Sequence, residues 1–380
     1  MGLTLERASL LAGLGLMQGI VERRTTVPIL GHVLLEPAGN ALTISATDLE
    51  VGIRTQVAST GKEKNLTLNA RKFFEIVREA EGSEVVLTSL DGDWVELKCG
   101  RAKFKTMGLD PRSFPAMPSQ NLSKEPSAAK KQVKAELALP ASLLATMIDK
   151  TIFAVSPDEA RYNLSGVYVE SNAPGAARMV ATDGHRLAMI EREVKGFKME
   201  GGAIIPRKGL VELRKILDDG GDAEVRLSID GQLAYLKRGA TEVSMRLVEG
   251  EFPDYRGVIP KQSKHKILIG RDALFAAIKR AAIFSSERYH GVKFAMSPGT
   301  LTVSSTSPET GEASESLDVE YRGEEFAIGF NSSYVQQVLG VIPAGGDSKV
   351  ELGLSDDVSP GVIRTPADSQ YTYVVMPMRL

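Results

Sequence analysis

The chain has 380 residues, a formal net charge of −2 at pH 7 and an apolar content of 43%, which is ordinary for a globular protein. Its length suits two or three domains, and its near-neutral charge excludes a surface that is basic throughout and holds nucleic acid by charge alone. No apolar run approaches the roughly 20 residues of a membrane-spanning helix, so we expect no membrane partner.

The first third of the chain is predicted to hold two helices and two hairpins. A glycine-led strand at 31–36 and alternating apolar residues at 42–46 flank the turn Gly39-Asn40. A second helix is predicted at 71–79, and a second hairpin pairs 84–90 with 94–99. The first helix precedes them, and its apolar side chains recur at helical spacing: Leu10, Leu11, Leu14, Met17, Ile20 and Val21.

The same order of elements returns twice, so the chain is a threefold repeat. The first helix returns with apolar stripes at 143–153 and 274–284, and the second at 207–217 and 331–342. The first two copies are 135 positions apart at each of two landmarks, and repeats of this kind mark homologous structural units. The landmarks are glycines that lead a strand and threonines that end one: Gly31, Gly166 and Gly291, then Thr47, Thr182 and Thr306.

Three similar α+β domains follow from this repeat, each with two helices packed on antiparallel sheets. We predict their bounds as 1–124, 135–258 and 265–380. The stretch 119–135 is rich in Ser, Lys and Pro, and 258–266 is short and basic, so both are predicted to be linkers.

Seven short segments, in this order, match one known family: VPILG at 27–31, ARKFF at 70–74, ATDGHRL at 181–187, PRKG at 206–209, FPDYR at 252–256, GFN at 329–331 and YVVMPMRL at 373–380. On these residues the chain resembles the bacterial sliding clamp, the beta subunit of DNA polymerase III, over essentially its whole length. The resemblance implies a head-to-tail homodimer closed into a ring, with helices lining a hole that holds double-stranded DNA. It also implies a processivity factor rather than an enzyme.

The helix at 207–217 supplies positive charge for such a hole. It carries Arg207, Lys208, Arg214 and Lys215 against Glu212, and the region 271–288 also has more cations than acids. The alternative, that these charges only solvate exposed helix faces, stays open for each residue alone. By resemblance, the residues expected to contact DNA are Arg24, Arg71, Tyr162, Arg207 and Lys208.

Two charged edge strands are predicted to close the ring. Arg101, Lys103 and Lys105 alternate along one strand, and acidic residues including Asp318 and Glu320 lie along another. Charged edges also discourage wrong strand pairing, which is an equally good reason for any single charge. By resemblance these edges meet in the dimer, with the following residues at the interface: Lys72, Arg101, Lys103, Phe104, Ile283, Phe284, Glu312 and Glu315.

The apolar tail at 374–380 has two methionines around a proline, and methionine adapts to varied ligands. Composition alone favours a core strand here, whereas the resemblance implies a pocket for short linear motifs. The implied partners are the DNA polymerase III alpha subunit, the clamp loader delta subunit, and other polymerases and repair proteins with clamp-binding motifs. The residues of this predicted peptide pocket are Leu164, Thr182, Gly184, His185, Arg186, Leu187, Pro253, Val258, Val374, Met376, Pro377, Met378 and Arg379.

Three positions depart from the family pattern. Gly257 replaces a second arginine, Pro360 a small polar residue, and Asn163 a second aromatic residue after Tyr162. They keep open two alternatives: a clamp paralogue specialised for inhibitor resistance, or a non-ring DNA-binding scaffold.

We expect no catalysis, metal or cofactor. The four histidines fall at no ligand spacing, and no phosphate-binding glycine loop is present. Asp183 follows Thr182 as Asp48 follows Thr47, so we attribute this pair to turn chemistry. Cys99 is the only cysteine and the N-terminal residues lack a secretory pattern, so we expect a cytoplasmic protein.

Overall fold

The structure is a computed structural model that describes residues 2–21, 26–118, 134–218, 221–286, 289–309 and 311–379. It divides into two compact units. Unit 1 combines Met1–Ala145 with Phe197–Leu247, and unit 2 combines Thr146–Gly196 with Val248–Leu380.

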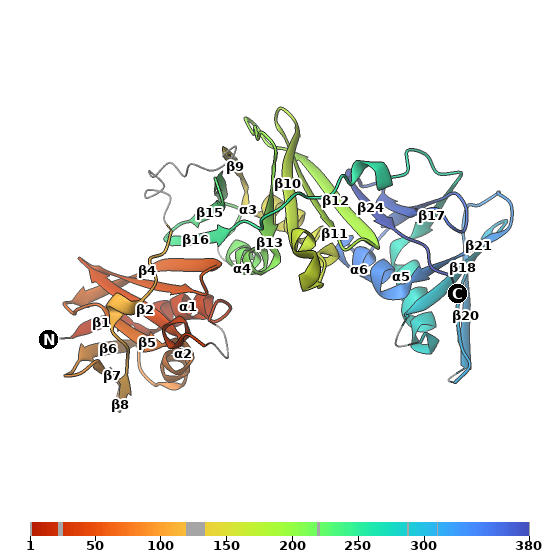
Figure 1. Cartoon of the computed structure of the whole chain (residues 1–380). Helices are drawn as coiled ribbons and strands as arrows, with labels where there is room; N and C mark the ends of the chain where they lie inside the picture. The colour runs from red at the N-terminus through yellow and green to blue at the C-terminus, as the bar shows by residue number, and fades with distance from the viewer. Residues whose placement is uncertain are drawn as a thin grey trace. The chain divides into compact units, whose positions relative to one another are not determined.

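Unit 1 is built on one antiparallel sheet in the order β8-β7-β6-β1-β4-β16-β15-β14-β9, and β3 joins β2 and β5 to it through β4. Helices α1 and α2 lie beside each other against β3, β4 and β5 (Figure 1). Its elements are β1 (Leu3–Glu6), α1 (Arg7–Met17), β2 (His32–Ala38), β3 (Ala41–Thr47), β4 (Val51–Gly61), β5 (Leu66–Asn69), α2 (Ala70–Glu79), β6 (Glu84–Ser89), β7 (Trp94–Cys99), β8 (Ala102–Met107), β9 (Lys134–Pro140), β13 (Gly202–Pro206), α4 (Arg207–Asp218), β14 (Glu224–Asp230), β15 (Leu233–Arg238) and β16 (Thr241–Arg246). Helix α3 (Ala141–Asp149) begins here and ends in unit 2.

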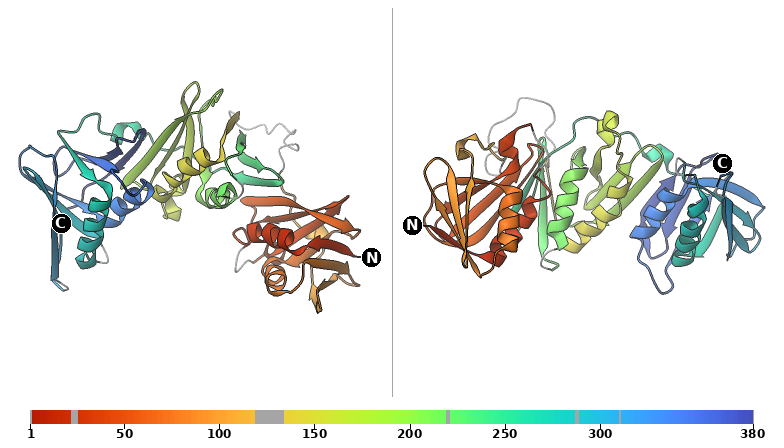
Figure 2. Two further views of the ribbon diagram at one scale, coloured as in Figure 1. Left: turned by 180° about the vertical axis from the view of Figure 1, so that it is seen from behind. Right: turned by 90° about the horizontal axis from the view of Figure 1, so that it is seen from below.

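Unit 2 has two antiparallel strand orders, β10-β11-β12-β24-β23-β22-β17 and β20-β19-β18-β21. Helices α5 and α6 pack on each other, and α5 covers β19 and β20 (Figure 2). Its elements are β10 (Gly166–Ala173), β11 (Ala176–Thr182), β12 (Arg186–Glu193), β17 (His265–Gly270), α5 (Arg271–Ala281), β18 (Gly291–Ser297), β19 (Thr300–Ser307), β20 (Gly311–Asp318), β21 (Phe326–Asn331), α6 (Ser332–Val341), β22 (Lys349–Leu354), β23 (Gly361–Thr365) and β24 (Asp368–Val375).

The predicted α+β repeat is confirmed in these elements, because the apolar stripes form the core. Leu10, Leu14 and Met17 are fully buried on α1. Helices α2 and α6 begin at asparagine caps: Asn69 Oδ1 accepts from Lys72 N at 3.1 Å, and Asn331 Oδ1 accepts from Ser333 N at 2.9 Å.

Several predicted boundaries differ from the structure. Helix α1 ends at Met17, so the buried Ile20 and Val21 follow it. Helix α3 ends at Asp149, so the predicted apolar stripe at 143–153 extends beyond it into the 3₁₀ turn Ile152–Ala154. Helix α5 ends at Ala281 and continues as a 3₁₀ turn at Ala282–Phe284. Of the first predicted linker, 119–133 lies outside the described residues, and the rest belongs to β9.

No helix within the described ranges is long and apolar enough to cross a membrane. In the same part of the chain, no group of three or more His, Cys, Asp or Glu side chains could hold a metal ion.

Candidate peptide pocket, DNA contacts and interface

A tight turn at the end of β11 forms one edge of the predicted peptide pocket. Thr182 Oγ1 donates to the Arg186 carbonyl at 2.6 Å and accepts from Gly184 N at 3.1 Å. Asp183 Oδ1 accepts from the backbone N–H groups of His185 and Arg186, at 2.9 and 3.1 Å. Gly184 has a φ of +87°, a conformation that glycine adopts without steric cost.

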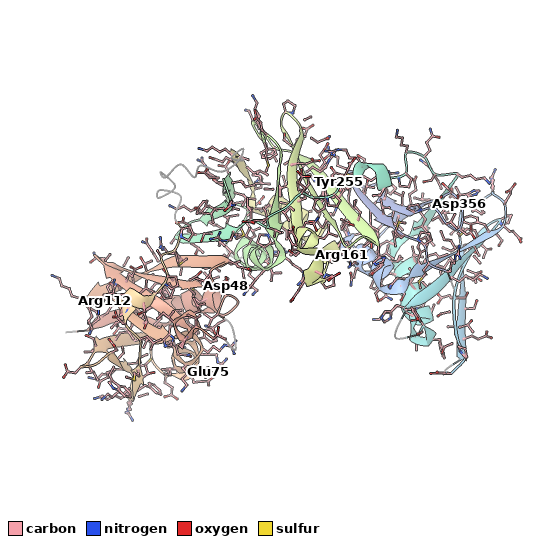
Figure 3. All side chains as sticks on the ribbon, viewed as in Figure 1. Asp48, Glu75, Arg112, Arg161, Tyr255 and Asp356 are labelled. Atoms are coloured by element: carbon pink, nitrogen blue, oxygen red, sulfur yellow. The ribbon has the colours of Figure 1, made fainter. Side chains whose placement is uncertain are left out.

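Unit 1 contains the same turn between β3 and β4. Thr47 Oγ1 donates to the Val51 carbonyl at 3.1 Å and accepts from Leu49 N at 3.0 Å. Asp48, labelled in Figure 3, accepts from the N–H groups of Glu50 and Val51 at 2.9 and 2.7 Å. The prediction that the repeated Thr-Asp pair serves turn chemistry is therefore confirmed.

The C-terminal tail lies along the turn in unit 2. Strand β24 pairs with β12, with Val374 opposite Leu187. Beyond the strand, Met376 N donates to the His185 carbonyl at 2.8 Å. The Met376 side chain is 41% exposed although its backbone is bonded, so an apolar group faces solvent here.

Beneath the tail lies a buried apolar cluster of Val180, Leu187, Tyr255 and Val374. Phe252 packs against it and stacks on Tyr168, with ring centroids 4.8 Å apart. This cluster gives the predicted pocket an apolar floor, which suits partner side chains such as Leu and Phe. Leu164 is buried in the same unit, whereas Pro253, Val258 and Arg379 are exposed and Pro377 and Met378 are half-buried.

Behind the floor, a buried carboxylate holds the segment 252–259. Tyr255, labelled in Figure 3, donates its hydroxyl to Glu170 and accepts from Arg178 Nη1 at 2.9 Å. Arg256 Nη2 lies 2.7 Å from Glu170 Oε2. Burial, with the Glu170 hydrogen bond, raises the pKa of Tyr255 to about 12. Glu170 and Arg178 carry no signal in the sequence, because their opposite charges meet only when β10 and β11 pair.

The cations predicted for the pocket differ in exposure. His185 and Arg379 are exposed, whereas the Arg186 side chain is only 7% exposed. Arg161, labelled in Figure 3, is not predicted from the sequence; it donates to the Asp183 carbonyl at 2.8 Å. At the departure Gly257, an added Cβ would meet no atom within 4 Å, so that side of the segment is open.

The predicted DNA-contacting residues lie in different settings. Tyr162 is 59% exposed and Arg207 is exposed, whereas Arg71 is half-buried and Arg24 lies outside the described residues. Lys208 forms an ion pair with Asp48, whose side chain is 5% exposed.

The positive surplus expected on α4 is smaller than its composition suggests. Lys215 Nζ lies 2.7 Å from Glu212, and Arg214 pairs with Asp218, which the helix also contains. The charge of this helix is therefore partly neutralised within unit 1.

The predicted interface strands each end a sheet within the described residues: β8 in unit 1 and β20 in unit 2. Lys103 is exposed on β8, and Arg101 lies in the turn before it. On α2 Lys72 is exposed, and Phe104 on β8 is half-buried. Alternation on β20 exposes Glu312 and turns Glu315 to the other face.

Helix α5 covers that other face of β20. Arg280 Nε binds Glu315 there at 2.7 Å, so Glu315 already has an ionic partner within its own chain. Ile283 is 72% exposed and Phe284 half-buried, at the end of the same helical segment.

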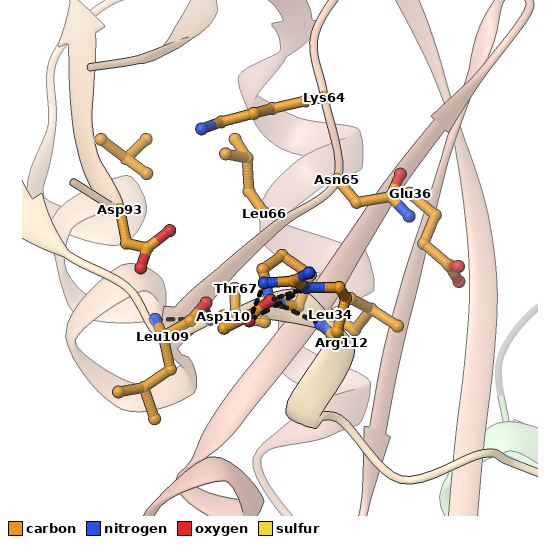
Figure 4. A pocket seen from close by; sticks show the side chains of 12 residues that line it. Leu34, Glu36, Lys64, Asn65, Leu66, Thr67, Asp93, Leu109, Asp110 and Arg112 are labelled. Atoms are coloured by element: carbon orange, nitrogen blue, oxygen red, sulfur yellow. Dashed lines mark hydrogen bonds and ion pairs between the residues drawn. The ribbon is translucent and has the colours of Figure 1, made fainter. Parts of the chain in front are cut away.

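Unit 1 also contains a cavity of about 420 Å³ between the β4–β5 connection and the segment after β8. Figure 4 shows the paired Asp110 and Arg112 at one end and the Lys64 side chain at the other. Leu34 and Leu66 supply part of its apolar lining. None of the predicted site residues lines this cavity.

Comparisons with known proteins agree over the whole chain. Three family profiles, for the N-terminal, central and C-terminal domains of the DNA polymerase III beta subunit, match residues 1–118, 138–254 and 256–379. Beta sliding clamps of Caulobacter vibrioides and Escherichia coli K12 are each 37% identical to the chain, with all of both chains covered. A crystal structure of the C. crescentus beta sliding clamp superimposes with a TM-score of 0.90 at 36% identity, and the P. aeruginosa DNA polymerase III subunit beta with 0.88 at 34%, both over the full chains.

Proposed function

The chain belongs to the beta sliding clamp family, the beta subunits of bacterial DNA polymerase III, and is a processivity factor of DNA replication; we propose that it acts as a head-to-tail dimeric ring around duplex DNA. A paralogue specialised for inhibitor resistance, or a non-ring scaffold, is not favoured by relatives that match along their entire length. The proposed role is non-catalytic and cytoplasmic, and the three predicted domains 1–124, 135–258 and 265–380 are its modules.

The strand pairing within the chain supports the ring. In unit 1 the last strand of the second repeat, β16, pairs with β4, and Ser244 faces Gly52. In unit 2 the last strand of the third repeat, β24, pairs with β12, and Val374 faces Leu187. Two strands of the repeats are left without such a partner: β8 is the last strand of the first repeat, and β20 is the strand of the third repeat that corresponds to β4 and β12. Both have free edges in the described structure. We therefore propose that β8 of one copy pairs with β20 of the other, which closes a ring when the rotation is right.

The repeat also specifies the register of that pairing. The landmark threonine of each repeat has one residue opposite it on the next strand. These pairs are Thr47 with Gly52, Thr182 with Leu187 and Thr306 with Glu312, so Glu312 corresponds to Gly52 and Leu187. Met107 ends β8 opposite Trp94, as Arg246 ends β16 opposite Leu233. Lys105 then corresponds to Ser244, and it would lie opposite Glu312 of the partner subunit.

A charge exchange tests this register. Lys105→Glu or Glu312→Lys alone should raise the dimer dissociation constant, and the double variant should recover part of the loss. Each exposed pair contributes only about 0.2 to 1 kcal/mol, so apolar contacts should dominate the strength. Replacing Ile283 and Phe284 together by alanine should therefore give monomers in sedimentation. A variant that stays dimeric would contradict the interface.

We propose that the pocket formed by the residues listed above, from Leu164 to Arg379, binds linear motifs of the polymerase III alpha subunit, the clamp loader delta subunit and other clamp partners. The exposed Met376 above the buried cluster of Leu187 and Val374 is the observation that carries this assignment. A few well-packed anchors dominate the affinity of such interfaces.

The test of the ring is retention on DNA. Phosphate contacts alone hold DNA with a Kd of only about 10⁻⁴ to 10⁻⁶ M and weaken steeply with salt, and this chain has a net charge of −2. Protein assembled on nicked circular DNA should therefore survive a high-salt wash and dissociate once the DNA is linearised. Equal retention on linear DNA would contradict topological binding.

A further inference from the structure

We infer that Arg186 is a positioning residue of the peptide pocket: its buried guanidinium ties the 182–187 turn to helix α6, so side chains on α6 outside the pocket set the pocket's affinity. This inference rests on the proposed peptide binding. It assigns Arg186 a role different from the partner contact that the sequence suggested.

All three nitrogens of the Arg186 guanidinium have partners within unit 2. Nε donates to Asp183 Oδ2 at 3.0 Å, and Nη2 donates to the Phe153 carbonyl at 2.6 Å. Nη1 donates to Gln337 Oε1 on α6. The guanidinium carbon also lies 4.4 Å from the centre of the Tyr334 ring.

These partners come from three separate elements: the turn itself, the 3₁₀ turn Ile152–Ala154, and α6. A buried cation is costly unless it is fully hydrogen-bonded. Arg186 is therefore held where these three elements jointly satisfy it. These bonds use three of its five N–H groups, and because the side chain is only 7% exposed a partner peptide has little access to the other two.

Hydrogen bonds to backbone carbonyls connect the 182–187 turn and helix α6 to the C-terminal tail. The His185 carbonyl, next to Arg186, accepts from Met376 N at 2.8 Å. Tyr373 on β24 donates its hydroxyl to the Tyr334 carbonyl of α6 at 3.0 Å. Helix α6, the turn and the tail therefore form one hydrogen-bonded unit, and a shift of Arg186 displaces the rim that carries Met376.

Gln337 is the position at which this tie can be changed without touching the pocket. It is exposed on α6, and it contributes a neutral acceptor to a cation. Gln337→Leu removes the acceptor, whereas Gln337→Glu replaces it with a stronger, charged acceptor. Gln336→Leu makes the same change of volume and polarity one residue earlier, and therefore on a different face of α6.

The experiment titrates each full-length variant into a fluorescein-labelled synthetic peptide from a polymerase III alpha subunit clamp-binding motif and follows anisotropy. Hydrogen bonds to charged groups are the stronger ones, so Gln337→Leu should weaken the peptide by about tenfold. Gln337→Glu and Gln336→Leu should keep the wild-type Kd. Thermal unfolding midpoints are measured in parallel.

Rescue by glutamate shows that the hydrogen-bond acceptor, and not the volume of the side chain, sets the affinity. The unfolding midpoints, which should stay well above the assay temperature in every variant, separate positioning from a general loss of stability. Wild-type affinity in Gln337→Leu would overturn the inference and leave the pocket intact, and equal weakening in Gln336→Leu would also overturn it. A wild-type protein that fails to bind the peptide would overturn the proposed pocket itself, and the inference with it.

Discussion

The Thr-Asp turns of unit 1 and unit 2 share the same backbone hydrogen bonds but have different side chains beside them. Arg246 N donates to the Glu50 carbonyl in unit 1 at 2.8 Å, and Met376 N donates to the His185 carbonyl in unit 2 at the same distance. The last hydrogen bond of β16 in unit 1, and the one just beyond β24 in unit 2, are therefore made to equivalent carbonyl groups of the two turns. In unit 1 that strand ends with the charged Arg246, and in unit 2 the exposed Met376 follows the strand.

The floors beneath the two turns differ as well. Unit 2 has Leu187 and Val374 above Tyr255, whereas unit 1 has Gly52 and Ser244. A Cβ at Gly52 would lie 2.6 Å from the terminal methyl of Met117, so methionine fills the space that leucine takes in unit 2. The comparison teaches that the repeated backbone supplies a place for a pocket: in unit 1 the buried Met117 fills that place, whereas in unit 2 the exposed Met376 lies over the apolar floor.

The largest effect is expected from a substitution in the apolar floor of the pocket in unit 2. Leu187 is 2% exposed, so Leu187→Ala should lower the free energy of unfolding by about 3 kcal/mol, in urea denaturation, through lost burial and a cavity. It should also abolish most peptide binding.

The matched control is Gly52→Ala in unit 1. Its new Cβ would lie 2.6 Å from the end of the flexible Met117 side chain and 3.0 Å from Ser244 Oγ, so both must shift, and we expect the free energy of unfolding to fall by only about 1 kcal/mol. Comparable losses in the two variants would contradict the difference between the floors.

A somewhat smaller effect concerns alkaline pH. Tyr255 has a folded pKa of about 12 against the ordinary value of 10, so its neutral form is favoured in the folded state. That contribution is complete below pH 10 and is lost as the pH rises to 12. The wild type should thereby lose about 2 to 3 kcal/mol more than Tyr255→Phe over this range.

Urea unfolding at pH 9 and pH 12 measures the difference between the two proteins. Met117 follows Phe114-Pro115 in unit 1 as Tyr255 follows Phe252-Pro253 in unit 2, and it does not titrate, so Met117→Leu serves as the control. Parallel pH profiles of the wild type and Tyr255→Phe would show that Tyr255 is not the group responsible.

At the rim, Met376→Ala should weaken a clamp-binding peptide by about tenfold, as expected for an interface anchor. Its unfolding midpoint should hardly change, because the side chain is largely solvent-exposed. Arg246→Ala, at the corresponding position in unit 1, should leave the affinity unchanged. Anisotropy titration measures the peptide Kd of both variants, and an unaltered Kd in Met376→Ala would contradict the pocket assignment.

The smallest effect concerns the turns themselves. Leu49 has a φ of +80° and is 57% exposed, so Leu49→Gly should relieve strain and raise the free energy of unfolding by about 0.5 kcal/mol. Gly184→Ala should do the opposite, since its Cβ would lie 2.9 Å from Arg161 Nη1 at an unfavourable φ. Thermal melts with the same sign for both variants would contradict the strain argument.

Much of the fold followed from local patterns. Apolar spacing predicted the helices that carry Leu10, Leu14 and Met17, and the repeated Thr-Asp predicted both turns, because these structures depend on residues a few positions apart. The apolar tail and the order of the family motifs located the candidate pocket.

The contacts of individual charges within the chain could not be predicted in this way. Arg186, Glu315 and Lys208 are predicted to contact a partner peptide, a second subunit and DNA. Within the chain they contact Gln337, 151 residues away, Arg280, 35 residues away, and Asp48. Partners this distant meet only after the strands have paired.

The amino-acid sequence by itself determined the threefold repeat, the helices, the turns and the membership of the clamp family, because periodicity and turn chemistry are properties of neighbouring residues. Only the tertiary structure decided which of two equivalent turns is filled by a buried side chain and which has an exposed methionine beside it, and which cations are already paired within the chain. The physical reason is that burial and charge pairing depend on side chains brought together from distant strands and helices.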